Sequence, residues 1–208
     1  MRVAREGLPF IAVGWAVLAL FLLLKLWWVA LLWLPIAIWL IAFFRDPARE
    51  GPRGDELILA PADGKVVSVI AIDEPAFLRG PATRISIFMN VLNVHVNRYP
   101  VSGRVAYRWY ARGKFGHAMA EKASSANEQC SLGLETSRGR LLVRQIAGSI
   151  ARRIVTDHEV GTTVRQAERM GLIRFGSRVD LFVPQAAEIL IRTGEATKAG
   201  QSVVARWP

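Results

Sequence analysis

A single histidine stands between two asparagines in residues 93–98, Asn-Val-His-Val-Asn-Arg. Alternate side chains of a β-strand share a face, so Asn93, His95 and Asn97 are predicted on one face and the two valines on the other. A histidine held by two amides in partial burial is suited to proton transfer near neutral pH. The same spacing is typical of a solvated strand edge, and the residues alone leave both interpretations open.

A Gly-Ser pair, Gly176-Ser177, interrupts an alternating apolar pattern over residues 172–183. Glycine weakens strand pairing, so a β-bulge is one interpretation. The other is a bend that lets a side chain approach its own backbone carbonyl. Upstream, Asp63 precedes Gly64 in a Pro-Ala-Asp-Gly sequence, which on local grounds makes Asp63 a turn residue.

The remaining histidines and the cysteine predict little chemistry by themselves. The three histidines, His95, His117 and His158, lack the spacing of metal ligands, so no metal site is expected. His158 lies in a polar stretch typical of a protein surface. The single cysteine, Cys130, excludes a disulfide framework and is expected to be an inert thiol.

The elements that position these residues begin after an apolar segment, residues 8–44, in which Lys25 is the only charged residue. The segment is too long for a signal peptide, and as a helix it would measure about 55 Å, nearly two hydrocarbon thicknesses. A helical hairpin that turns near Lys25 is therefore predicted. One helix kinked at Pro35, or a re-entrant element, is the alternative.

Charge predicts how this segment meets a membrane. The chain carries a net charge of +10, which favours an anionic partner. Because the apolar segment is so long, we expect anionic phospholipid and not nucleic acid. Arginines at both ends of the segment place both ends on the cytoplasmic face by the positive-inside rule. Trp27, Trp28 and Trp33 are candidate anchors at the interface.

Residues after the segment predict a compact, mainly β (α+β) domain. The expected domains are a membrane-associated segment, 1–50, and a β-rich domain, 51–208. Strands are predicted where apolar and β-branched residues alternate or cluster, with the first two forming a hairpin: 57–60, 65–70, 83–96, 140–146, 152–155 and 172–183. Residues 121–129 form the one predicted helix of this domain.

Four sequences in register along the chain resemble the short bacterial and archaeal form of phosphatidylserine decarboxylase. They are Phe-Phe-Arg-Asp-Pro at 43–47, Pro-Ala-Asp-Gly-Lys-Val at 61–66, the histidine sequence at 93–98, and Gly-Leu-Ile-Arg-Phe-Gly-Ser-Arg-Val-Asp at 171–180. The order and spacing also agree, and together they cover nearly the whole chain.

The resemblance implies a proenzyme that makes its own cofactor. Ser177 Oγ would attack the carbonyl of Gly176, and β-elimination from the resulting ester would split the chain into residues 1–176 and 177–208. The former Ser177 would become a pyruvoyl group. Its carbonyl would form a Schiff base with the serine amine of phosphatidylserine and accept the electrons released with CO₂, leaving phosphatidylethanolamine.

The resemblance also implies roles for other residues. Asp63 matches a residue thought to orient a histidine that activates the serine, and His95 matches a family histidine. Where longer relatives have a second histidine, this chain has Arg98, so either His95 serves both steps or Arg98 contacts the substrate's carboxylate or phosphate. The implied substrate-binding residues are Arg98, Asn97, Lys114 and His117.

The implied partners are phosphatidylserine, anionic membrane lipids, and the two cleaved chains for each other, with homo-oligomers also compatible. The implied location is the cytoplasmic face of the cell membrane. Two alternatives from other classes remain. A biotinyl- or lipoyl-like carrier would share the sequence around Gly64 and use Lys65 as the modified residue. A non-catalytic membrane-anchored β module would explain the charge and the apolar segment.

Overall fold

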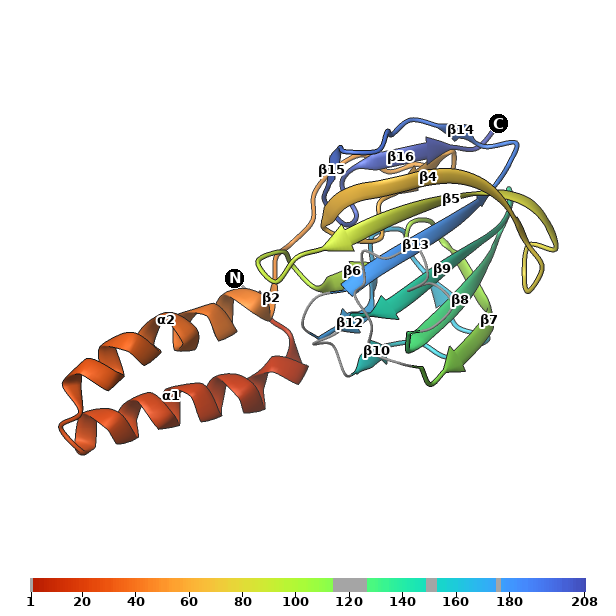
Figure 1. Ribbon diagram of the computed structural model, residues 1–208. Helices are drawn as coiled ribbons and strands as arrows, with labels where there is room; N and C mark the ends of the chain where they lie inside the picture. Colours follow the sequence, from red (N-terminus) through yellow and green to blue (C-terminus); the bar gives the residue numbers. More distant parts are fainter. Residues whose placement is uncertain (1, 114–126, 149–152, 175–176) are drawn as a thin grey trace. The chain divides into compact units, whose positions relative to one another are not determined.

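The computed structural model describes residues 2–113, 127–148, 153–174 and 177–208 (Figure 1). The chain divides into two units, Met1–Ala48 and Arg49–Pro208. The first is helical and the second is built from strands, as the mainly β fold class predicted.

The first unit is a helical hairpin. Its elements are β1 (Arg2–Val3), the 3₁₀ helix η1 (Arg5–Gly7), α1 (Leu8–Leu23), α2 (Trp27–Phe43) and β2 (Arg45–Asp46). Lys25 lies in the turn between the helices with a left-handed backbone, φ 59°. Strands β1 and β2 pair antiparallel, which holds the two ends of the hairpin together. The alternative of one helix kinked at Pro35 is wrong, because the chain turns at residues 24–26 and forms two helices, with Pro35 inside the second.

Small residues and one hydrogen bond hold the two helices together. A Cβ atom on Gly14 would lie 2.5 Å from Leu40 Cδ1, so glycine permits the close approach of the helices. The Trp33 indole N–H donates to the Gly14 carbonyl at 2.8 Å. Trp33 therefore packs within the hairpin, unlike the exposed Trp27 and Trp28.

The described residues of the second unit form fourteen strands. They are β3 (Leu57–Leu59), β4 (Gly64–Glu74), β5 (Gly80–Met89), β6 (Val96–Arg98), β7 (Gly103–Ala111), β8 (Gln129–Thr136), β9 (Gly139–Ala147), β10 (Ile154–Thr156), β11 (Thr163–Val164), β12 (Arg169–Ile173), β13 (Ser177–Pro184), β14 (Glu188–Ile189), β15 (Ala196–Thr197) and β16 (Val203–Arg206).

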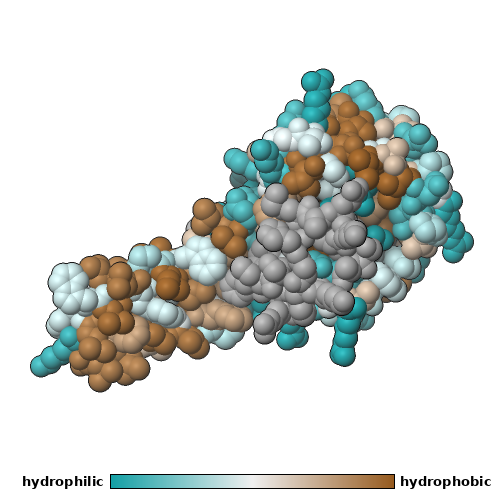
Figure 2. All heavy atoms as spheres, in the orientation of Figure 1, coloured by the Kyte–Doolittle hydropathy of each residue, from teal (hydrophilic) through white to brown (hydrophobic). Residues whose placement is uncertain are grey.

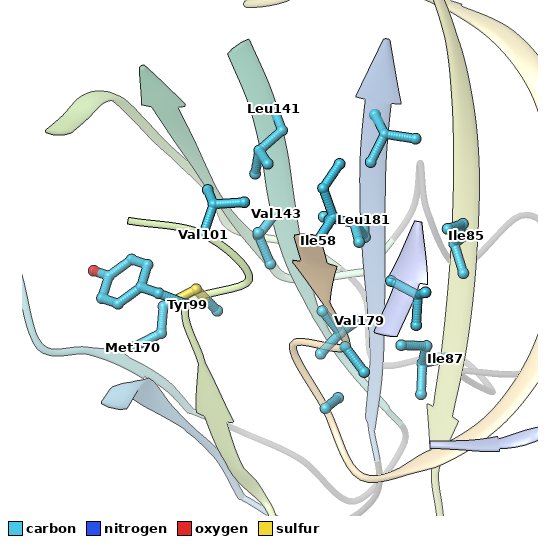
Figure 3. Packing of buried hydrophobic residues seen from close by; sticks show 14 of the residues in the cluster. Ile58, Ile85, Ile87, Tyr99, Val101, Leu141, Val143, Met170, Val179 and Leu181 are labelled. Atoms are coloured by element: carbon cyan, nitrogen blue, oxygen red, sulfur yellow. The ribbon is translucent and has the colours of Figure 1, made fainter. Parts of the chain in front are cut away.

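These strands form one large and two small antiparallel sheets. The eight-stranded sheet has the order β11-β7-β8-β9-β13-β5-β4-β15, and the three-stranded sheets have the orders β10-β12-β6 and β14-β16-β3. Alternation along the strands turns one face of the large sheet inward, where it packs against apolar residues of both small sheets (Figure 3). Met170 comes from one small sheet and Ile58 from the other.

Several local predictions were wrong because sheet pairing overrides local pattern. Strand β3 pairs with β16 and β4 pairs with β5, so residues 57–70 form no hairpin. Residues 83–96 lie partly in β5 and reach β6 only at Val96, and residues 172–183 are divided between β12 and β13 in different sheets. The predicted helix at 121–129 lies mostly outside the described residues, and its last residue, Gln129, begins strand β8.

Candidate active site

Ser177 is the first residue of β13, a central strand of the large sheet. It pairs with Met89 of β5 on one side and with Ala147 of β9 on the other. The side chain is fully buried on the inner face of the sheet, and its hydroxyl donates to Met89 Sδ at 3.4 Å. A thioether is a weak acceptor, so this contact positions the hydroxyl without holding it strongly.

A buried pair of amides lies on the other side of the same sulfur. Asn97 Nδ2 donates to Met89 Sδ at 3.6 Å, and Gln145 Nε2 donates to Asn97 Oδ1 at 2.7 Å. Gln145 is opposite Val179 in the ladder, so its side chain lies on the same face as Ser177. We refer to Met89, Asn97 and Gln145, from strands β5, β6 and β9, as the group around Ser177: Met89 contacts the Ser177 hydroxyl, Asn97 contacts Met89, and Gln145 bonds to Asn97.

His95 is fully buried just before β6. The His95 Nδ1 lies 3.0 Å from the Asn93 carbonyl oxygen, which can only accept, so Nδ1 is the donor. In the neutral imidazole the lone pair is then on Nε2. The backbone carbonyl of His95 accepts a hydrogen bond from the Ile173 N–H at 3.3 Å, and Ile173 lies four residues before Ser177 in the chain. His95 and Asn93 precede the strand, so the predicted continuous strand face does not hold.

Asp63 lies at the same end of the large sheet as Ser177. Lys65 pairs with Phe88, so Gly64 is level with Met89, and two strand spacings separate Gly64 from Ser177, roughly 10 Å. A Cβ atom on Gly64 would lie 2.1 Å from the Phe88 carbonyl oxygen, which explains the glycine.

The Asp63 carboxylate accepts two hydrogen bonds from Arg49, both at 2.8 Å, and one from Ala199 N–H at 2.8 Å. Both ionic side chains of this pair are largely buried. The carboxylate thus binds Arg49, and the role of Asp63 in orienting a histidine stays a prediction.

Asn97 and Arg98, both predicted to bind substrate, point their side chains to opposite faces of β6. As neighbours in β6 they face opposite ways; Asn97 joins the group around Ser177, whereas Arg98 donates to the Ala167 carbonyl at 3.0 Å. Gly176, Lys114 and His117 lie outside the described residues, and their roles stay predictions.

A buried ion pair lies directly behind Ser177. Arg178 Nε donates to Asp180 Oδ1 at 2.6 Å and Arg178 Nη2 donates to Ser86 Oγ at 2.7 Å. Arg178 is 2% exposed and Asp180 is fully buried. Both residues face away from the side of the sheet that holds the Ser177 side chain, so the pair anchors the start of β13 from the opposite face.

The other titratable residues singled out in the sequence lie elsewhere. His158 Nδ1 is 3.2 Å from the hydroxyl of the buried Tyr99, and His158 Nε2 is 3.5 Å from Glu168. His158 is thus partly buried in a contact of its own and is not a fully exposed residue. Cys130 is buried, and burial raises the pKa of its thiol, which lowers its reactivity.

The described residues contain no group of three or more His, Cys, Asp or Glu side chains that could hold a metal ion. They do contain a buried hydroxyl, a buried histidine, and amides close to the hydroxyl. Such a site is suited to activating a serine hydroxyl by proton transfer.

Comparison with known proteins decides the family. The profile described as phosphatidylserine decarboxylase matches residues 36–205. A phosphatidylserine decarboxylase proenzyme of Symbiobacterium thermophilum is 46% identical over 209 residues, covering 99% of this chain and 96% of the relative. The chain belongs to the phosphatidylserine decarboxylase family. A proenzyme of the same name from Syntrophus aciditrophicus is 45% identical over 202 residues, covering 96% and 95% of the two chains.

Membership of the phosphatidylserine decarboxylase family confirms the resemblance and makes the chain an enzyme of this type. It argues against the carrier interpretation, and so does the position of Lys65. Lys65 pairs with both Phe88 and Ala196 inside the large sheet, whereas a carrier presents its modified lysine at the tip of a protruding hairpin.

Sequence reasoning missed Met89, Gln145 and the Arg178–Asp180 pair. Met89 and Gln145 resemble ordinary residues of apolar strands and reach Ser177 only through sheet pairing. Arg178 and Asp180 carried a signal that could have been used, because two opposite charges at alternate positions of a buried strand must pair with each other or with other charges.

Proposed function

We propose that this chain is a self-cleaving proenzyme that decarboxylates phosphatidylserine to phosphatidylethanolamine in phospholipid biosynthesis. The observation that carries the proposal is the buried Ser177 hydroxyl, held at the start of a central strand within a group of polar side chains. The relatives named above are phosphatidylserine decarboxylase proenzymes, and the name proenzyme implies a chain that is processed.

In the proposed cleavage, Ser177 Oγ attacks the carbonyl carbon of Gly176 as a proton leaves the hydroxyl. The peptide bond becomes an ester, β-elimination then breaks the ester, and water releases ammonia from residue 177. His95 is the proposed proton acceptor, because its Nδ1 proton faces the Asn93 carbonyl and leaves the lone pair on Nε2. The Asn97 amide contacts the same sulfur as the serine hydroxyl and helps to fix its position.

Asp63 has a supporting part in this proposal. Its carboxylate is held by Arg49 and by the backbone of Ala199 at the end of the sheet where Ser177 lies. We infer that Asp63 influences His95 either through a rearrangement away from Arg49 or by its charge alone.

The residues around Ser177 fit a pyruvoyl group, which is small, uncharged and made from that serine. The group supplies an electron-withdrawing carbonyl that takes up the electron pair released as CO₂ leaves. Buried amides at Asn97 and Gln145 offer donors and an acceptor near this position, and His95 can hold or return a proton. Arg98, Lys114 and His117 remain candidates for binding the anionic headgroup.

The architecture supports continued association of the two chains after cleavage. Residues 177–208 would begin with β13, which lies between β5 and β9 in the large sheet. β15 also pairs with β4, and β16 pairs with β3. Backbone hydrogen bonds in two sheets would therefore hold the smaller chain to the larger one, and separating the two chains would require unfolding.

For location, we propose the cytoplasmic face of the cell membrane, anchored by the helical hairpin. η1 and α1 together, Arg5–Leu23, are long and apolar enough to cross a bilayer. Arg2, Arg5 and Arg45 lie at the end of the hairpin where β1 and β2 pair, which favours a cytoplasmic position for that end.

The test is to compare wild type, Ser177→Ala and a control, Ser68→Ala, in membranes containing phosphatidylserine. Mass spectrometry should show two chains for wild type and Ser68→Ala, the smaller beginning at residue 177 with a blocked N-terminus. Ser177→Ala should stay intact and form no phosphatidylethanolamine. An intact wild-type chain with no lipid product would overturn the proposal.

A further inference from the structure

The two helices of the hairpin are apolar on every side. Neither α1 nor α2 contains a charged residue, and many of their large side chains are exposed, as the brown surface over both helices shows (Figure 2). A helix that lies flat in the headgroup region needs one polar face. These helices have none, so they are unsuited to lying along the membrane surface.

The turn between the helices has a different character from their sides. Lys25 is exposed there, and Trp27 and Trp28 are 63% and 79% exposed. Lysine and tryptophan are the residues that prefer the boundary between hydrocarbon and headgroups. The turn is thus built for an interface and not for the middle of a bilayer.

Helix length distinguishes a hairpin that crosses the bilayer from one that stops half-way. The 17 residues of α2 measure about 25 Å, against a hydrocarbon core of ~30 Å. The stem of Lys25 can cover the remaining distance of about 5 Å to the far headgroups. A turn held at half depth would leave the Lys25 ammonium group in hydrocarbon, where a charge is costly.

We propose that the hairpin crosses the bilayer twice, so that Lys25, Trp27 and Trp28 reach the headgroups of the leaflet opposite the paired strands β1 and β2. The proposal rests on the membrane location given above but not on the chemistry at Ser177. The antiparallel pairing of Arg2 with Asp46 keeps both ends of the hairpin on one side, as two crossings require.

The experiment introduces one new cysteine at a time, because the only native cysteine, Cys130, is expected to give a low labelling background. Cys130 is buried with a raised thiol pKa, so the folded wild-type chain should react little with maleimides. Leu24→Cys places a thiol at the turn, where Leu24 is 59% exposed, and Arg2→Cys places one at the other end as the matched control. Leu26→Cys is a second probe of the turn.

Spheroplasts that make each full-length variant are treated with a membrane-impermeant maleimide before and after permeabilisation. Leu24→Cys and Leu26→Cys should be labelled in intact spheroplasts, and Arg2→Cys only after permeabilisation. Labelling of the turn variants only after permeabilisation, or only in detergent, would overturn the proposal. Chain cleavage is measured in the same samples. A turn that is labelled on an uncleaved chain would contradict the proposed cleavage at Ser177 but would support the two crossings of the bilayer.

Discussion

The two units of this protein differ in which side chains they expose and which they bury. The hairpin turns large apolar side chains outward and buries small ones, such as Ala30 and Ala37, between its helices. The β unit turns apolar residues inward and also buries polar groups, with Ser177, Asn97 and Gln145 on one face of the sheet and the Arg178–Asp180 pair on the other. Polar groups that are costly to bury are thus concentrated around the residue proposed to react.

The largest effect that tests this contrast is expected at the buried ion pair. Arg178→Leu removes the two hydrogen bonds that the Arg178 guanidinium donates to the buried Asp180 carboxylate, and the free energy of unfolding should fall by about 3–5 kcal/mol. Denaturant titration of the full chain in detergent micelles measures it. The control is Arg140→Leu, which breaks the exposed pair with Glu135 and should cost less than about 1 kcal/mol. Equal losses of stability in the two variants would show that burial of the Arg178–Asp180 pair makes no difference.

A smaller effect is expected in the amide pair beside Ser177. Gln145→Leu leaves the buried Asn97 Oδ1 without its donor, which should cost about 1–3 kcal/mol and slow cleavage at Ser177. The time course of cleavage after synthesis measures the second effect.

The control for Gln145 is Gln129→Leu, another buried glutamine. Gln129 pairs with Ile146, which pairs with Arg178, so its side chain lies on the opposite face from Ser177. Cleavage should proceed at the wild-type rate in this variant. If both variants slow cleavage alike, the effect belongs to the core in general and not to the group around Ser177.

The β unit should also lose stability at high pH in a way that the uncharged helices cannot. Burial, with added repulsion from Asp157 and Glu168, raises the pKa of Tyr99 well above the ordinary value near 10. The folded chain therefore keeps this proton when the unfolded chain has lost it, so the stabilisation is complete below about pH 10 and is lost above it.

Unfolding measured from pH 8 to 11 in wild type and Tyr99→Phe checks this expectation. The alkaline decline should be shallower in Tyr99→Phe. Both chains retain Cys130, so the difference between the two curves isolates the tyrosine. Parallel curves would show that the Tyr99 hydroxyl does not contribute.

The smallest effect is expected in the hairpin. Trp33→Phe removes the hydrogen bond to the Gly14 carbonyl, and such bonds between helices in membranes contribute about 0.6 kcal/mol on average. Thermal loss of helical circular dichroism in micelles should shift slightly, with Trp28→Phe at the exposed turn as control and cleavage unchanged in both. If Trp33→Phe lost more stability than Gln145→Leu, the hairpin and not the β unit would depend more strongly on its polar contacts.

Local pattern predicted the two helices of the hairpin and about half of the described strands in the β unit, because apolar runs and alternation depend on neighbours in the chain; the long strands β7 and β8 were missed. It failed where a strand's partner is distant. The predicted hairpin at 57–70 does not form, since β3 pairs with β16 from the end of the chain. Residues 172–183 were predicted as one interrupted strand, whereas they are divided between β12 and β13 of different sheets, because the sheet that each strand joins depends on partners distant in the chain.

The sequence predicts an apolar segment that turns at Lys25, a β-rich remainder, and four sequences in order that resemble one decarboxylase family. Those features follow from composition and spacing along the chain. The contacts of Met89 with Ser177 and Asn97, of Gln145 with Asn97, and of Asp63 with Arg49 follow only from the three-dimensional fold. Such contacts join residues far apart in sequence, and their partners are chosen by sheet register and burial, which no local pattern encodes.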